Sequence, residues 1–283
     1  MPRSALVHRF TIAVHLFASS GSGRPNLAEH QGNDLLLRIP GSNEKQTEVA
    51  PALIGYPCQV SETGSEPAVL FDIDGTLVDS NYLHVTTWSR AFDEVGEAVD
   101  SWRIHDSIGL DGGLLLDALL PNATDDTKGR AKELHTRYYE ESASLLRPLS
   151  GTHELLEAIA ARHLQIVLAT SASDAELSIL RKVLGVDDIV SAVTSAEDVD
   201  TAKPNPDIVG IALKRAGVSA KHAVFVGDTK WDAKACARAG VTFVGLRTGG
   251  SPAQKLLDAG AAAVFDDPAQ LLEQLDDSPI GRL

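Results

Sequence analysis

The sequence predicts an α/β fold, a doubly wound parallel sheet with an inserted all-helical cap domain. Five apolar runs of strand length alternate with helical segments, a pattern typical of such a sheet. These runs are apolar throughout, as expected for strands that are covered on both faces. About 90 residues separate the first two runs, far more than one crossover helix needs, which indicates an insertion.

Glycine, hydroxyl or acidic residues follow the end of each predicted strand. Helix ends are marked by a Ser-x-x-Glu capping box at Ser173 and Glu176, and by Asn205-Pro206 and Gly217 at the two ends of a later helix. The alternation therefore extends over the whole second half of the chain. The expected strands are residues 68–72, 165–170, 189–194, 223–227 and 241–246.

Apolar residues recur at helical spacing inside the long gap and predict at least two amphipathic helices. We expect a helical cap domain over residues 81–147 and a core domain formed by residues 66–80 and 148–283. Two tryptophans, Trp88 and Trp102, are expected in the interior of the cap. The helical series are Val85, Trp88, Phe92 and Val95, and then Leu134, Tyr138 and Leu145.

Residues 1–65 differ from the rest in composition. They are rich in Gly, Ser, Pro and Asn, show no periodicity, and hold five Lys or Arg against five Asp or Glu, so the net charge of -14 comes from the remainder. We expect a disordered or weakly structured N-terminal extension. A targeting segment and a start codon assigned too far upstream are the alternatives.

The overall composition excludes several classes of protein. With 43% hydrophobic residues the chain is globular, and the charge of -14 disfavours a nucleic-acid or anionic-membrane surface. No apolar run reaches the roughly 18 residues of a membrane span. Two cysteines, Cys58 and Cys236, are too few for a disulfide framework, so we expect a reducing, cytoplasmic location.

Acidic, hydroxyl and basic residues follow the predicted strands, where the ligand crevice of an open α/β sheet lies. Two carboxylates two residues apart can hold a hard cation while one of them attacks a substrate, and a hydroxyl beside a helix N-terminus suits a phosphate oxygen. Each residue alone is more often an ordinary cap or surface charge, but the ordered set is not. The set is Asp72, Asp74, Gly75 and Thr76, then Thr170 and Ser171, then Lys203, and last Asp228 and Asp232.

These four motifs, in this order, resemble those of the haloacid dehalogenase superfamily over about residues 66–275. The helical insertion resembles the C1-type cap of its phosphoglycolate phosphatase and β-phosphoglucomutase-like branch. The resemblance implies a Rossmann-like core and an Mg²⁺-dependent phosphatase. Such an enzyme hydrolyses a small phosphorylated metabolite through an aspartyl-phosphate.

The resemblance also implies roles for individual residues. Asp72 is the nucleophile, and Asp74 protonates the leaving oxygen and then activates water. The Asp72 carboxylate, the Asp74 carbonyl and the Asp228 carboxylate hold Mg²⁺, with Asp232 supporting the metal shell or Lys203. The phosphate-binding residues are Thr170, Ser171, Lys203, Gly75 and Thr76, and Lys203 offsets charge on the phosphoryl group and on Asp72.

Alternatives remain open at this point. A β-phosphoglucomutase-type phosphomutase would use the same two aspartates, Asp72 and Asp74, in catalysis. A non-catalytic phosphate-binding or interaction protein would use neither of them for catalysis. The family's dehalogenases lack an acid at the position of Asp74, and its phosphonate hydrolases need a cap lysine, whereas Lys128 and Lys132 are expected at the surface. The glycine-rich segment 103–113 is either a substrate-specificity loop or a simple helix-to-helix turn.

Overall fold

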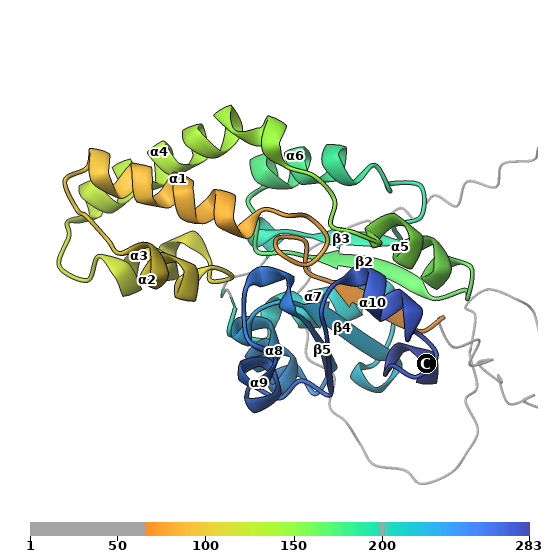
Figure 1. Cartoon of the computed structure of the whole chain (residues 1–283). Coiled ribbons are helices and arrows are strands. Elements are labelled where there is room, and N and C mark those ends of the chain that lie inside the picture. The colour runs from red at the N-terminus through yellow and green to blue at the C-terminus, as the bar shows by residue number, and fades with distance from the viewer. Residues whose placement is uncertain (1–65, 199–200, 202) are drawn as a thin grey trace, which may run out of the picture. The chain divides into compact units, whose positions relative to one another are not determined.

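The computed structural model describes residues 66–198, 201 and 203–283; the predicted extension lies outside the described residues. A six-stranded parallel sheet forms the centre, in the order β3-β2-β1-β4-β5-β6 (Figure 1). The doubly wound α/β class is therefore confirmed. The strands are β1 (Ala68–Phe71), β2 (Gln165–Ala169), β3 (Ala192–Thr194), β4 (Ala223–Gly227), β5 (Thr242–Leu246) and β6 (Ala263–Phe265).

Strand β1 lies in the middle of the sheet, and all four of its residues are fully buried. Its last residue, Phe71, is in register with Leu168 of β2 and Val226 of β4. The backbone N–H of Asp72 donates to the carbonyl of Val226 at 3.0 Å. The residues that follow these three strands therefore emerge at one edge of the sheet.

Helices cover both faces of the sheet, as the uniformly apolar strands predict. One face packs against α5, α6 and α10, and the other against α7 and α8. The core helices are α5 (Thr152–Ala160), α6 (Asp174–Leu184), α7 (Asp207–Ala216), α8 (Lys230–Ala239), α9 (Ala253–Asp258) and α10 (Pro268–Glu273). Short 3-10 turns are η1 (Ala143–Leu145), η2 (Ala196–Asp198), η3 (Ala220–His222), η4 (Arg247–Gly249) and η5 (Ile280–Arg282).

Most predicted helix ends are confirmed. Ser173 and Glu176 form the capping box that opens α6, and Gly217 ends α7 with a φ of 68°. Helix α7 begins at Asp207 with Pro206 as its N-cap, one residue later than predicted.

Two strands differ from the prediction, both near the sheet edges. Strand β3 covers only the second half of residues 189–194, and β6 was not predicted at all. Each has three residues and is only partly buried, so each lacks the long apolar run that marks a strand covered on both faces.

Four of the α-helices between β1 and β2, those that precede α5, pack around an apolar interior of their own (Figure 1). Trp88 is buried there, but Trp102 is 70% exposed, so its prediction was wrong. Leu145 lies beyond the end of α4 in η1 and is also exposed. The four are α1 (Asn81–Glu94), α2 (Ser101–Ser107), α3 (Gly112–Leu119) and α4 (Asp125–Glu141).

Among the described residues, no helix combines the length and the apolar character that crossing a bilayer requires.

Candidate active site

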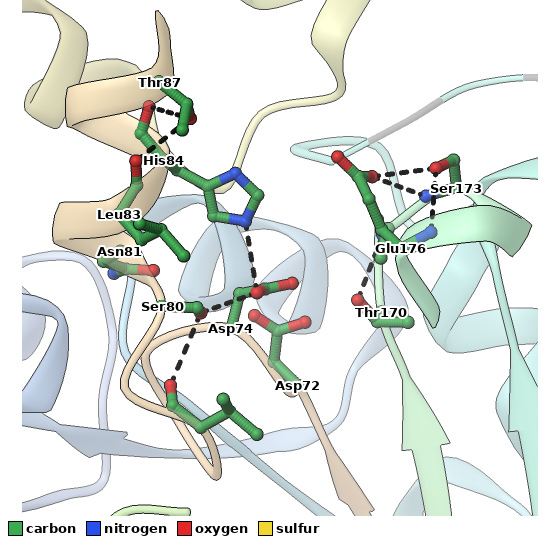
Figure 2. A network of polar contacts seen from close by, with 12 residues as sticks. Asp72, Asp74, Ser80, Asn81, Leu83, His84, Thr87, Thr170, Ser173 and Glu176 are labelled. Atoms are coloured by element: carbon green, nitrogen blue, oxygen red, sulfur yellow. Dashed lines mark hydrogen bonds and ion pairs between the residues drawn. The ribbon is translucent and has the colours of Figure 1, made fainter. Parts of the chain in front are cut away.

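The predicted motif residues meet at the carboxyl edge of the central strands. Asp72 and Asp74 follow β1, Thr170 follows β2, and Asp228 follows β4. Figure 2 shows Asp72 and Asp74 side by side, with Thr170 across from them. The parallel register of β1, β2 and β4 brings these strand ends together.

A buried lysine connects two of the aspartates. The Nζ atom of Lys203 lies 2.8 Å from Asp72 Oδ1 and 2.7 Å from Asp232 Oδ1. Lys203 is 1% exposed, and burial alone would lower the pKa of its ammonium group, but Asp232 and Asp72 outweigh this and raise that pKa. Lys203 is therefore a permanent positive charge beside Asp72.

The nearby positive charge of Lys203 does not offset the burial of the Asp72 and Asp228 carboxylates. Burial raises the pKa of Asp72 to about 7, because the opposing effect of Lys203 is smaller and Asp232 and Asp74 add to the rise. Burial, Asp232 and Asp72 likewise raise the pKa of Asp228 well above its usual range. A cluster with these properties favours an added cation.

The oxygens of this cluster fit a hard divalent cation. Carboxylate oxygens of Asp72, Asp228 and Asp232 lie within 4.8 Å of one another. Both oxygens of Asp232 already have partners, since Oδ1 pairs with Lys203 and Oδ2 accepts hydrogen bonds from Thr229. Asp72 pairs with Lys203 through Oδ1 only, and the two oxygens of Asp228 accept from the neutral donors Thr76 and Asn81. Asp72 and Asp228 are therefore better candidates than Asp232 for binding a divalent cation that prefers oxygen ligands.

Asn81 was not predicted as a site residue, yet it contacts the cluster. Its Nδ2 donates to Asp228 Oδ2 at 2.7 Å, and its buried Oδ1 has no hydrogen-bond partner among the described residues. An unpartnered buried oxygen beside Asp228 agrees with a cation site. Thr76 holds the other side of Asp228, because its hydroxyl donates to Oδ1 at 3.1 Å.

Asp74 is held by the first turn of the helical insert. Its Oδ1 accepts hydrogen bonds from Ser80 Oγ at 2.6 Å and from His84 Nε2 at 3.2 Å, as Figure 2 shows. Burial raises the pKa of Asp74, but these hydrogen bonds outweigh it and the net shift is downward. Burial lowers the pKa of His84, but the hydrogen bond to Asp74 and the negative charge of Asp74 outweigh it, so the net shift is upward.

A second histidine extends this contact. His84 Nδ1 and His135 Nε2 share a hydrogen bond of 3.1 Å, and His135 stacks on Trp88 with ring centres 4.0 Å apart. Burial, together with the nearby charges of His84 and Lys132, lowers the pKa of His135 well below its ordinary value. The sequence signal for His135 was a polar residue on the apolar face of α4, and it was overlooked.

A cavity of about 170 Å³ lies between the insert and the core. The core contributes Asp72, Asp74, Lys203 and the Thr170-Ser171 turn. The insert contributes residues 108–112 of the glycine-rich segment, together with Trp88, Leu115, Lys132, His135 and Thr136. Lys132 was expected at the surface; it is exposed, but it also lines this cavity.

Gly75 and Thr76 lie on the far side of the cluster. They are not among the described residues that line the cavity, and a Cβ atom on Gly75 would lie 2.6 Å from Asp228 Oδ2. Both residues therefore shape the surroundings of Asp228. Their predicted contact with a phosphate group stays a prediction.

The insert also contacts the core outside the cavity. Asp106 of α2 pairs with Lys230 and Lys255 of the core, each at 2.7 Å. His105 shares a hydrogen bond of 2.9 Å with the carbonyl of Gly249. These contacts hold the insert over the carboxyl edge of the sheet.

Comparisons with known proteins agree with this geometry. The family model of haloacid dehalogenase-like hydrolases matches residues 69–246. An N-acetylmuramic acid 6-phosphate phosphatase of Pseudomonas aeruginosa is 28% identical over 74% of this chain and 94% of its own length. A phosphorylated carbohydrates phosphatase of Thermotoga maritima is 29% identical over 74% and 97%. A hydrolase structure from Pseudomonas syringae superposes with a TM-score of 0.72 at 36% identity, covering 75% of this chain and 99% of that one.

Proposed function

Since this chain belongs to the haloacid dehalogenase-like hydrolase family, we propose that it is an Mg²⁺-dependent phosphatase that hydrolyses a small phosphomonoester. Two of the similar proteins carry names of sugar-phosphate phosphatases, which supports a phosphorylated metabolite as substrate. The small cavity between insert and core is in keeping with that class.

The observation that carries the proposal is the position of Asp72. Its carboxylate lies in the cavity and is held 2.8 Å from the buried ammonium group of Lys203. An anionic nucleophile and an anionic phosphate repel each other, and a fixed positive charge between them lowers that barrier. Asp72 would attack phosphorus through a carboxylate oxygen, so that an acyl-phosphate bond forms while the ester P–O bond breaks.

In this proposal Asp74 transfers the protons of both half-reactions. The Asp74–His84 pair holds a proton at the cavity, and in this proposal Asp74 passes it to the departing ester oxygen. In the second half-reaction Asp74 takes a proton from water as that water attacks the phosphorus of the aspartyl-phosphate. Inorganic phosphate leaves, and the Asp72 carboxylate is restored.

The other motif residues complete the proposed site. Thr170 and Ser171 line the cavity and would bind phosphoryl oxygens. Asp72 and Asp228, with the main-chain carbonyl of Asp74, would hold Mg²⁺. When bound, Mg²⁺ would neutralise negative charge on the transferring phosphoryl group.

The test is phosphate release from a panel of small phosphomonoesters, with Mg²⁺ and with a chelator. We expect release that depends on Mg²⁺ and falls at least about 1,000-fold in Asp72→Asn, because a nucleophile is removed. Asp93→Asn, an exposed aspartate of the insert, is the matched control and should retain full activity.

Two results would contradict the proposal. Normal turnover in Asp72→Asn would exclude Asp72 as the nucleophile. Conversion of a sugar phosphate to its isomer without phosphate release would instead support the phosphomutase alternative.

A further inference from the structure

Three side chains with metal-binding groups converge beside the proposed catalytic residues. His84 comes from α1, His135 from α4 and Glu176 from α6, so two belong to the insert and one to the core. Their ligand atoms all lie within 4.8 Å of one another, and all three residues line the cavity. Two imidazoles and one carboxylate form a ligand set that proteins use for zinc.

The distance between the two histidine nitrogens is close to that expected at a coordinated ion. His84 Nδ1 and His135 Nε2 are 3.1 Å apart. Two nitrogens on one tetrahedral zinc ion, with bonds of about 2.0–2.1 Å, are separated by about 3.3 Å. Glu176 Oε1 lies 3.8 Å from His135 Nδ1, the ring nitrogen that does not face His84, and one ligand atom of each residue lies within 4.8 Å of the other two. Shifts of the Glu176 carboxylate and of the His135 ring would bring Oε1, His84 Nδ1 and His135 Nε2 onto one ion.

The surroundings orient each ligand. His84 Nε2 is directed at Asp74 Oδ1, which leaves Nδ1 facing His135; a carboxylate behind a ligating histidine is the usual arrangement at metal sites. The His135 ring is stacked on Trp88 at an interplanar angle of 14°. Glu176 Oε2 accepts hydrogen bonds from the Ser173 backbone and hydroxyl, so Oε1 is the oxygen left to turn toward an ion (Figure 2).

We propose that His84, His135 and Glu176 form a second metal site that takes a nitrogen-preferring transition ion such as Zn²⁺. It is separate from the cluster of Asp72, Asp228 and Asp232, whose oxygen-only ligands suit Mg²⁺. The bound ion would replace the hydrogen bond between the two histidines. It would also tie the insert to the start of α6.

One consequence rests on the proposed function. Zn²⁺ bound to His84 Nδ1 leaves no proton on that nitrogen, which restricts proton transfer through His84. The same ion joins α1 and α4 to the core, which restricts movement of the insert. We expect Zn²⁺ to slow phosphate release when Mg²⁺ is saturating. Binding itself is measured without turnover, so failure of this site and failure of the proposed function are distinguishable.

The test is calorimetric titration of the full chain with Zn²⁺ while excess Mg²⁺ occupies the acidic cluster. We expect one Zn²⁺ per chain, with affinity reduced at least about 10-fold in His135→Gln and in Glu176→Gln. Glutamine at position 176 retains the capping box of α6, so that variant removes the charge and keeps the fold. His222→Gln, at a histidine of η3 away from the cavity, is the matched control and should bind normally.

A spectroscopic readout locates the ion. Co²⁺ in place of Zn²⁺ should give the strong visible bands of a four-coordinate ion in the unmodified protein and in Asp72→Asn, and lose them in His135→Gln. Absence of stoichiometric Zn²⁺ binding would overturn the proposal. So would binding that Asp72→Asn abolishes and that His135→Gln and Glu176→Gln leave unchanged, because the ion would then lie in the acidic cluster.

Discussion

The Asp72 carboxylate should destabilise the folded protein when no metal is bound. Asp72 is 4% exposed, and burial raises its pKa from 3.8 to about 7 despite the contact with Lys203. Between these two values the folded protein holds more protons than the unfolded chain. Stability is therefore lost as pH rises from about 4 to about 7, and the full penalty applies above that range.

The size of the penalty follows from the two pKa values. At 1.36 kcal/mol per pKa unit, a rise from 3.8 to about 7 corresponds to about 4 kcal/mol. This is an upper limit, because Asp228 is titrated together with Asp72. In Asp72→Asn the charge is gone, while Lys203 keeps Asp232 as a partner at 2.7 Å.

The assay is urea denaturation in the presence of a chelator, at about pH 5 and about pH 8. We expect Asp72→Asn to be more stable than the unmodified protein at the higher pH, by up to about 4 kcal/mol, with the difference shrinking at the lower pH. Asp93→Asn is the control for a surface carboxylate. Parallel pH dependence of the unmodified protein and Asp72→Asn would refute the reasoning.

Two further substitutions test the surroundings of the cluster and the contact between insert and core. A Cβ atom in Gly249→Ala would lie 1.7 Å from Asp228 Oδ2, so we expect a stability loss of about 1–3 kcal/mol and weaker Mg²⁺ binding, measured by denaturation and metal titration. Asp106→Asn removes two partly exposed ion pairs, so we expect a higher KM in steady-state kinetics with a stability change below about 1 kcal/mol.

Each substitution has a matched control. Gly129→Ala lies on α4 with open space around the new methyl group, and should raise stability by up to about 1 kcal/mol. Asp117→Asn breaks an ion pair inside the insert and should leave KM unchanged. Unaltered Mg²⁺ affinity in Gly249→Ala, or equal KM values in the two aspartate variants, would contradict the assigned contacts.

The position of the candidate site was predictable, because the carboxyl ends of neighbouring parallel strands lie at one edge of the sheet. Asp72, Thr170 and Asp228 each follow a buried apolar run, and the register of β1, β2 and β4 places those ends together. Lys203 was predicted from its motif alone. Its two ion pairs depend on the loop that folds back to Asp72 and Asp232.

The helical insert was harder to predict in detail. Helical spacing identified Trp88 as interior, but Trp102 is exposed, because the short helix α2 turns it outward. Asn81 and His135 belong to none of the four motifs, and Glu176 was predicted only as part of a helix cap. Each became recognisable when side chains from separate elements met at Asp228 or His84.

The sequence by itself determined the fold class, the presence of a helical insertion and the order of the motif residues, because strand burial, helix caps and strand-end chemistry are local properties of the chain. Only the tertiary structure decided what surrounds Asp74 and Asp228, and where Gly75 and Thr76 lie relative to the cavity. The Thr76–Asp228 contact joins residues 152 positions apart through the folded sheet, whereas the contacts of Asn81 and His84 exist only once the insert packs against it.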